Sequence, residues 1–304
     1  MSLNASPAAG AKDRPLAGIL HMVAAACAIA GIDVLSKLVV GAMPVAQMLA
    51  LRAGFVVLML LPFFRGAGGF ALFRTRHVPI HLVRIACQFV AMLSFFAALQ
   101  HLPIAMVVAL GFSSPIFVTA LSQPILGEKV GVARWLAVVA GFVGAVIVVD
   151  PWSARFDPLA LLGLVAAMGW ALAQILSRIL TRTESDAAIL LFVNSGLLVG
   201  LGTTAAFVWA PVSLDHAGVC FLLAVLLLAS QWLLLRAVRL APIAVVSPFQ
   251  YLELPLAILG GWLLWREWAG SHVFAGAALI VGSGLFVVML EHRRTARAGG
   301  GRRP

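Results

Sequence analysis

Four charged side chains interrupt long apolar stretches of the sequence and are its first candidates for chemistry. They are Asp33, Arg52, Arg84 and Glu253. Charged groups in segments long enough to cross a bilayer are costly, so they face a cavity or a partner. Glu253 lies in the stretch PIAVVSPFQYLELP (residues 242–255), which also contains an amide, the single tyrosine of the chain and helix-breaking prolines. The Glu253 carboxyl can accept a proton or bind a substrate amine; the alternative is an acid that stays protonated and has only a structural role.

Two of these charges, Asp33 and Arg52, lie in the first and second apolar segments. Their opposite signs predict an ion pair that ties the two segments together or, with Glu253, a site for coupling to protons. Arg84 lies about two helical turns from the predicted inner surface, and Lys37 lies near the outer end of the first segment. Both side chains are long enough to extend their charge to the membrane interface.

Neutral polar side chains form stripes at helical spacing. Trp170, Gln174 and Ser177, for example, fall at i, i+4 and i+7. A polar stripe facing lipid is unfavourable, so these stripes point inward, either into a substrate cavity or into hydrogen bonds between helices. The candidate cavity residues are Gln88, Ser113, Ser114, Trp170, Gln174, Gln231, Ser247, Gln250, Tyr251 and Glu253. Pro115 and Pro248 interrupt helical hydrogen bonding in mid-segment and are candidate hinges, with a static bend as the alternative.

Catalytic and metal-binding patterns are missing from the sequence. The seven histidines form no HExxH set, and the three cysteines, Cys27, Cys87 and Cys220, are scattered singly. No GxxxxGK[ST] phosphate loop occurs. The two carboxylates at depth, Asp33 and Glu253, lie in different halves of the chain. The sequence therefore predicts no catalytic residue, no metal and no cofactor, and it disfavours a membrane-embedded enzyme.

Composition places the chain in a membrane. It is 62% hydrophobic and only 11% charged, too few charges to cover a soluble protein of 304 residues, and its mean hydropathy is +1.07. The apolar residues fall in blocks of about 18–25, the length that crosses a bilayer core. Ten spans are predicted, at residues 16–36, 45–64, 78–99, 103–125, 131–149, 158–180, 187–209, 217–238, 242–264 and 271–290.

The basic residues predict how the chain is oriented. Of the 21 Lys and Arg, two lie at membrane depth, three lie in segments predicted outside, and the other sixteen lie in segments predicted inside. By the positive-inside rule, both termini are cytoplasmic, including a polar tail at 1–15 and a basic tail at 292–304. Because the net charge of +10 is located at helix ends, it indicates orientation in a membrane and not nucleic-acid binding.

The two halves of the sequence are similar to each other. PIAMVVALGFSSPIFVTALSQPILGEK, which begins at Pro103, matches PIAVVSPFQYLELPLAILGGWLLWREW, which begins at Pro242, without a gap and with Glu128 aligned to Glu267. Upstream, VLSKLV in the first span matches ILSRIL in the sixth. Since each half has five spans, the second copy crosses in the opposite sense, as in many secondary transporters. The expected fold is an all-α polytopic membrane protein with ten transmembrane helices, arranged as two inverted five-helix repeats (16–150 and 158–291) around a central cavity.

These residues also carry a family resemblance. The segments LALRAGFVVLMLLP, FFAALQHLPIAMVVALGFSSPIFVTALSQPILGEKVGVARWLAVVAGFVGAVIVVDP and LAPIAVVSPFQYLELPLAILGGWLLWRE resemble the EamA-type members of the drug/metabolite transporter superfamily. The resemblance implies alternating-access transport of a small organic metabolite across the bacterial-type inner membrane, and it extends to the YddG type of amino-acid exporter.

On this resemblance, the first expectation for the substrate is export of aromatic or apolar amino acids. The alternative is a carrier of nucleosides, riboflavin or another vitamin or nucleotide derivative. The expected partners are a small-molecule substrate and the lipid bilayer, with protons as a candidate coupling ion and no nucleic acid. The sequence fixes neither the direction of transport nor the oligomeric state, and it is compatible with a monomer.

Overall fold

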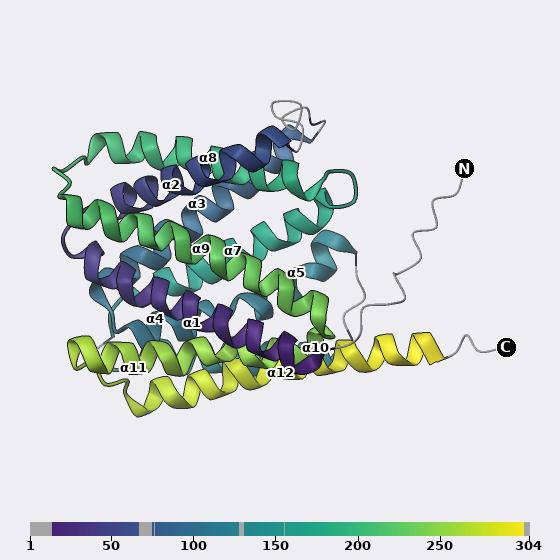
Figure 1. Cartoon of the computed structure of the whole chain (residues 1–304). Coiled ribbons are helices and arrows are strands. Elements are labelled where there is room, and N and C mark those ends of the chain that lie inside the picture. The colour runs from purple at the N-terminus through teal and green to yellow at the C-terminus, as the bar shows by residue number, and fades with distance from the viewer. Residues whose placement is uncertain (1–13, 67–74, 76, 128–130, 155, 301–304) are drawn as a thin grey trace.

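The structure, a computed structural model of the chain, describes residues 14–66, 75, 77–127, 131–154 and 156–300. This described part is helical, without strands, and most of its helices run along one common direction (Figure 1). The elements are α1 (Pro15–Val40), α2 (Val45–Gly66), α3 (Val78–His101), α4 (Ile104–Gly111), α5 (Ser114–Leu126), α6 (Val132–Val149), α7 (Ala160–Leu180), α8 (Asp186–Phe207), α9 (Leu214–Leu240), α10 (Ile243–Val246), the 3₁₀ helix η2 (Ser247–Leu252), α11 (Glu253–Trp265) and α12 (Ser271–Gly300).

Helix ends follow the local sequence. Ser185 and Ser213 precede α8 and α9, and each side chain accepts a backbone N–H three residues later at 3.2 Å. Such caps satisfy N–H groups that have no partner within the helix. At the other end of a helix, α5 stops where Gly127 adopts a left-handed conformation with φ of 70°, which glycine tolerates because it has no Cβ.

Among the described residues, nine segments are long and apolar enough to cross a membrane, and they match nine of the ten predicted spans. The tenth, predicted at 242–264, is split into α10, η2 and α11. The fourth span is also interrupted, between α4 and α5. In both, a proline (Pro115 or Pro248) occupies the first turn of the element that follows the break, where its missing N–H costs least. The breaks lie where the prolines predicted them, and a hinge function there stays a prediction.

The packing of the helices shows the inverted repeat directly. A two-fold axis between the halves makes each helix of the first half equivalent to one of the second: α1 to α7, α2 to α8, α3 to α9 and α6 to α12. A contact between two helices that are not equivalent to each other must then occur a second time, between their two counterparts. Helix α1 packs along α9, and the equivalent pair α7 and α3 packs in the same way. The pairs α2–α9 and α8–α3 are likewise counterparts, while the equivalent helices α2 and α8, and α6 and α12, pack on each other across the axis. The fold class predicted from the sequence is thus the observed one.

Small residues bring α6 and α12 close together. A Cβ on Gly144 would lie 2.7 Å from the carbonyl oxygen of Gly276, and a Cβ on Gly276 would lie 2.5 Å from that of Gly144. Small residues at four-residue spacing in the sequence predict a packing face on both helices, formed by Ala137, Gly141 and Ala145 in the fifth span and by Ala278 and Gly282 in the tenth. This is correct for α6, where Gly141 is buried, but wrong for α12: Ala278 and Gly282 are exposed, and the packed face lies on the opposite side of the helix.

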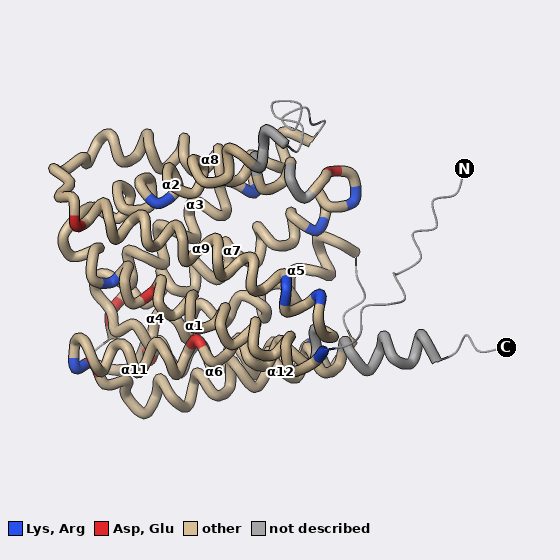
Figure 2. Tube along the Cα trace, in the orientation of Figure 1, with Lys and Arg blue, Asp and Glu red and all other residues tan. Residues whose placement is uncertain are grey.

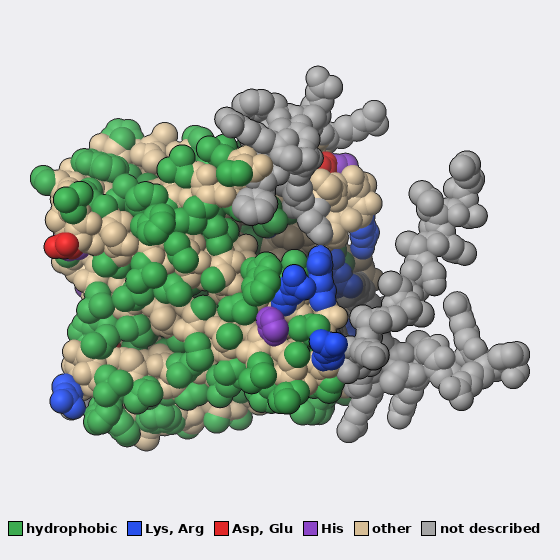
Figure 3. Space-filling model, viewed as in Figure 1, with side chains coloured by type: hydrophobic (Ala, Val, Ile, Leu, Met, Phe, Trp, Pro, Cys, Tyr) green, Lys and Arg blue, Asp and Glu red, His purple; other side chains and the backbone are tan. Residues whose placement is uncertain are grey.

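The outside of the bundle has the polarity expected of a membrane protein. Lys and Arg gather toward the end where α1 begins and α12 ends, which is called the near end below; acidic and basic residues both lie at the opposite, far end (Figure 2). Hydrophobic side chains cover the flank in between (Figure 3). Exposed Leu, Val and Phe on this flank are what a helix needs to face lipid tails.

Candidate functional site

A cavity of about 670 Å³ lies at the centre of the bundle. Its walls come from α1, α2, α3, α4, α5, α7, α8, α9, η2 and α11, whereas α6 and α12 contribute none of the described lining residues. The lining residues lie in the middle of the bundle and in its near half, and none of the described turns at the far end reaches the cavity. The cavity therefore extends from mid-membrane toward the near end.

Charged groups of both signs face this cavity. Asp33, Arg52, Arg84 and Glu253 all line it. Asp33 and Arg52 are each 4% exposed. Asp33 is close enough to interact electrostatically with both Arg52 and Glu253. However, the predicted direct ion pair does not form, because no salt bridge within 4.0 Å joins Asp33 to Arg52.

The position of each buried charge explains why the direct pair does not form. The Arg52 guanidinium lies 5.2 Å from the Phe96 ring and 4.0 Å from the Met92 sulfur, contacts that hold it against α3. One carboxylate oxygen of Asp33 is buried without a hydrogen-bond partner. A buried acceptor of this kind is costly unless water or a ligand satisfies it.

Arg84 is held inside the bundle instead of extending to the interface. Its Nε donates to the Ser177 hydroxyl at 2.6 Å, and its Nη1 donates to the Ile189 carbonyl at 3.3 Å. These bonds connect α3 to α7 and α8 where the cavity approaches the near end. Ser177 therefore serves a contact between helices, while its stripe neighbours Trp170 and Gln174 face the cavity.

Amide side chains dominate the neutral polar wall. The predicted residues that line the cavity are Gln88, Ser114, Trp170, Gln174, Gln231, Gln250 and Glu253, together with Asp33, Arg52 and Pro115. The four glutamines come from four different elements, α3, α7, α9 and η2. Because an amide both donates and accepts hydrogen bonds, this wall can bind a neutral polar ligand from several sides.

Three predicted cavity residues and one predicted hinge do not line it. Ser113 is 2% exposed, and Ser247 has a buried hydroxyl. The Tyr251 ring packs 5.1 Å from that of Phe112, and a Cβ on Gly284 of α12 would lie 2.3 Å from its hydroxyl. Tyr251 thus fills the space between η2, α4 and α12. Pro248 also lies away from the lining.

Of the aromatic side chains on the cavity wall, only Trp170 was predicted from the sequence. Phe95, Phe96 and Phe112 line the cavity beside Trp170, and the Phe95 and Trp170 rings lie 5.1 Å apart. Asn194, from α8, also lines it. Because phenylalanine is apolar, its side chain can face lipid or a cavity, and only the helix packing distinguishes the two. Asn194, as an amide at membrane depth, was the one signal available in the sequence.

The two halves contribute equivalent positions to the lining. In the alignment of PIAM with PIAV and of VLSK with ILSR, many lining residues of one half match lining residues of the other. The pairs include Asp33 and Gln174, Gln88 and Leu227, Met92 and Gln231, Gly111 and Gln250, and Ser114 and Glu253. The backbone around the cavity therefore obeys the two-fold relation, while the side chains at equivalent positions differ in charge and polarity.

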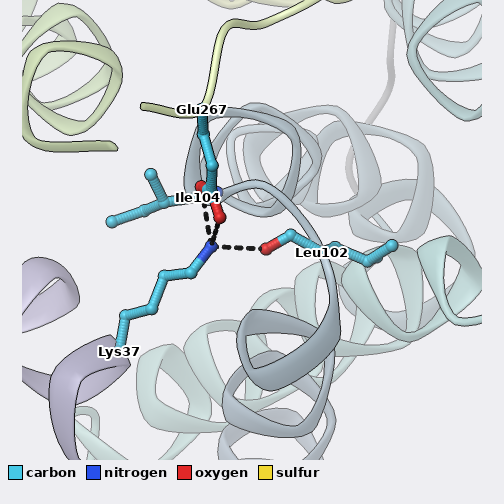
Figure 4. Close-up of polar contacts among 4 residues, drawn as sticks. All are labelled: Lys37, Leu102, Ile104 and Glu267. Carbon is cyan, nitrogen blue, oxygen red and sulfur yellow. Dashed lines mark hydrogen bonds and ion pairs between the residues drawn. The ribbon is translucent and has the colours of Figure 1, made fainter. Parts of the chain in front are cut away.

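At the far end, the structure corrects the prediction for Lys37. Its ammonium does not extend to the interface but contacts both carboxylate oxygens of Glu267, at 2.6 and 2.7 Å, and the Leu102 carbonyl, at 2.8 Å (Figure 4). A second tie at this end is made by Gln47, whose fully buried amide exchanges two hydrogen bonds, of 2.7 and 3.0 Å, with the backbone of Ala210.

The described residues contain no group of three or more His, Cys, Asp or Glu side chains that could hold a metal. His77 and His81 have the four-residue spacing of a histidine pair on one helix face, but no third ligand joins them among the described residues. What the cavity offers is binding: aromatic faces, amide groups and a small number of buried charges in an apolar enclosure.

Comparison with known proteins agrees with this geometry. Residues 16–150 match the model of the EamA-like transporter family. The chain is 35% identical to a riboflavin transporter of Rhizobium johnstonii, over 96% of this chain and 97% of the relative. It is 31% identical to a riboflavin transporter of Vibrio cholerae, over 94% and 97%, and 26% identical to an S-adenosylmethionine uptake transporter of Rickettsia bellii, over 87% and 91%.

A crystal structure of 16% sequence identity superimposes with a TM-score of 0.57, covering 89% of this chain and 98% of the other, and supports the fold alone. The similarity to the two riboflavin transporters extends over nearly the whole length of both chains. The chain therefore belongs to the EamA-like transporter family of the drug/metabolite transporter superfamily and is a multi-pass membrane transporter, not an enzyme.

Proposed function

We propose that this protein carries riboflavin, or a closely related vitamin, across the bacterial inner membrane through the central cavity. The observation that carries the proposal is near full-length similarity to riboflavin transporters from two different bacteria, at 35% and 31% identity. This corresponds to the alternative derived from the sequence. The first expectation, amino-acid export, has no support in the names of these relatives.

The chemistry of the cavity is compatible with a flavin. Riboflavin combines a flat heteroaromatic ring system, which both donates and accepts hydrogen bonds, with an uncharged polyhydroxyl chain. The cavity of about 670 Å³ falls within the usual range for small-molecule sites, roughly 300–1,000 Å³. We assign Trp170 and its neighbouring phenylalanines to the ring, and Gln88, Gln174, Gln231 and Gln250 to the polar edges and hydroxyls.

S-adenosylmethionine is the second candidate, favoured by one feature of the cavity. Asp33 and Glu253 lie within electrostatic reach of each other on the wall, and two carboxyls can attract a sulfonium cation. Related uptake transporters of Rickettsia have that substrate in their name, at 26% identity. The lower identity, and the presence of Arg52 and Arg84 on the same wall, make riboflavin the stronger candidate.

The roles of the buried charges and the prolines are part of the proposal. Glu253 and Asp33 are the candidates for carrying a coupled proton, with Arg52 as the balancing charge, and Pro115 and Pro248 are the candidate hinges. The working unit is the pair of repeats, 16–150 and 158–291. The distribution of Lys and Arg supports a cytoplasmic near end, with the tails 1–15 and 292–304 on that side.

Uptake of labelled riboflavin into proteoliposomes tests the proposal. We expect saturable uptake that unlabelled riboflavin abolishes and that a tenfold excess of tryptophan or leucine leaves unchanged. Uptake of labelled S-adenosylmethionine, measured in parallel, separates the second candidate from the first. Saturable uptake of S-adenosylmethionine without riboflavin uptake would replace the proposal by the second candidate, and uptake of neither vitamin nor cofactor would overturn both.

A further inference from the structure

The far end of the bundle is closed over the cavity. Between the cavity and this end, Val40, Leu99 and Ile104 belong to one core cluster and are each at most 1% exposed. The described residues that line the cavity include none of the turns at the far end. A transporter that works by alternating access must open this end once per cycle, so the contacts that hold it closed are functional candidates.

One polar cluster joins the segments that meet there. Glu267 lies in the connection between α11 and α12 and accepts both the Lys37 ammonium and, at 3.3 Å, the backbone N–H of Ile104 (Figure 4). Lys37, near the end of α1, also donates to the Leu102 carbonyl at 2.8 Å. The four residues therefore connect α1, the turn between α3 and α4, and the end of α11.

The cluster is shielded enough to be strong. The side chains of Lys37 and Glu267 are 8% and 25% exposed, and the ammonium lies 5.4 Å from the Trp265 ring. Removing one partner of a shielded ion pair leaves the other charge uncompensated, which is far more destabilising than losing a surface pair. The closed far end is therefore favoured by this cluster, and opening must break it.

The same three helices line the cavity in mid-membrane. Asp33 is one helical turn before Lys37 on α1. Helix α4 begins at Ile104 and reaches the cavity at Val108, and α11 begins at Glu253 on the cavity wall. A ligand that shifts α1, α4 or α11 in the cavity therefore acts on the cluster through rigid helices only a few turns long.

We propose that Lys37, Glu267 and the Leu102–Ile104 backbone form a latch that closes the far end of the transport pathway and is released once in every cycle. Lys37 and Glu267 are thus positioning residues for transport, although neither touches the cavity. The inference rests on the transport activity of the family and is independent of whether riboflavin is the substrate. If the cluster were only structural, its loss would lower the stability of the fold and leave the far end closed. If it is a latch, its loss raises the fraction of molecules that are open at the far end.

Thiol accessibility measures that fraction without any substrate. In the variant Val108→Cys, the new thiol lines the cavity on α4, about one turn beyond Ile104. A charged, membrane-impermeant methanethiosulfonate is applied to the far side of sealed vesicles, and modification of this position is read by peptide mass spectrometry. Lys37→Met and Glu267→Gln are each expected to raise the far-side modification rate at least tenfold, about 1.4 kcal/mol in the closed–open equilibrium.

The matched control is Arg266→Gln, which removes an exposed far-end cation next to Glu267 that lies over the Trp262 ring. It is expected to leave the rate unchanged. Far-side rates equal to the parent in both Lys37→Met and Glu267→Gln would overturn the latch, whatever the outcome of riboflavin uptake.

A second measurement guards against misfolding of these variants. In Lys37→Cys/Glu267→Cys, a reversible bifunctional thiol reagent replaces the ion pair by a covalent link. Peptide mass spectrometry also identifies molecules in which the bifunctional reagent has reacted with the Val108→Cys thiol, and these are left out of the rate. Cross-linking is expected to return far-side modification of the remaining free Val108→Cys thiol to the parent level. Reduction, followed by removal of the reductant and a fresh application of the methanethiosulfonate, is expected to raise it again. Modification that stays high in the cross-linked protein, or low after reduction, would also overturn the proposal.

Discussion

The contact between α6 and α12 makes a sharp prediction about stability, because two glycines of the same helix differ completely in their surroundings. A Cβ on Gly276 would meet the Gly144 carbonyl oxygen at 2.5 Å and the Val148 backbone nitrogen at 2.9 Å. Both obstacles are backbone atoms that no rotamer change can move. A Cβ on Gly282, in contrast, would meet no atom within 4 Å.

Gly276→Ala must therefore push the two helices apart, and overpacking of this kind costs about 1–3 kcal/mol. Gly282→Ala adds a methyl group at an exposed helical position, where alanine is about 1 kcal/mol more favourable than glycine in soluble hosts. With about 2–4 °C in Tm per kcal/mol for large domains, we expect Gly276→Ala to melt roughly 2–12 °C below the parent.

The assay is thermal unfolding of the two purified variants in the same detergent, followed by tryptophan fluorescence and by loss of the monodisperse peak. Gly282→Ala should melt within about 4 °C of the parent, in the stabilising direction. Equal melting temperatures for the two variants would refute the argument that backbone contact, and not small-residue content, holds these helices together.

Two further predictions concern the cavity. Trp170→Ala removes a ring that packs 5.1 Å from Phe95. It is expected to raise the KM for riboflavin uptake about two- to thirteenfold, from roughly 0.5–1.5 kcal/mol of aromatic contact; a KM equal to the parent would remove Trp170 from the binding site. Glu253→Gln keeps the size of the side chain but cannot exchange a proton, so we expect saturable uptake that an imposed pH gradient no longer accelerates. Gradient dependence that survives in Glu253→Gln would assign proton coupling to another group, with Asp33→Asn as the next variant to test.

Features that depend on local sequence were predictable. Blocks of apolar residues of membrane-crossing length placed the helices, because each block must satisfy its own backbone in lipid. Pro115 and Pro248 located the two interrupted spans, since each removes a backbone N–H donor in mid-span. Pro62 and Pro124 lie near the ends of α2 and α5, which continue through them. Glutamines in mid-span also pointed correctly to the interior, because an amide that faces lipid has no hydrogen-bond partner.

Features that depend on which helix lies opposite were not predictable. Spacing alone does not tell the two small-residue faces of α12 apart, and the one containing Ala278 faces outward. Tyr251 shares a stripe with Gln250, yet its ring fills the gap between Phe112 and α12 instead of facing the cavity. For Lys37, the partner is 230 residues away in the sequence, so nothing near it in the chain distinguishes a buried ion pair from a charge that extends to the interface.

The equivalence of lining positions explains how one duplicated fold can bind a ligand with no symmetry of its own. Two inverted copies are needed because each must adopt the conformation of the other for the pathway to open at opposite ends, so helix packing must remain nearly two-fold.

Ligand binding does not require the side chains of the two halves to be the same. At equivalent positions around the cavity, Asp33 corresponds to Gln174, and Ser114 corresponds to Glu253. Each exchange places a charge or an amide on one side only, which defines a single orientation for the ligand. Selection for switching thus acts on the backbone and its small-residue contacts, while selection for the substrate acts on a few side chains that are free to differ between the halves. Relatives of one fold can then differ in substrate by changing these side chains alone.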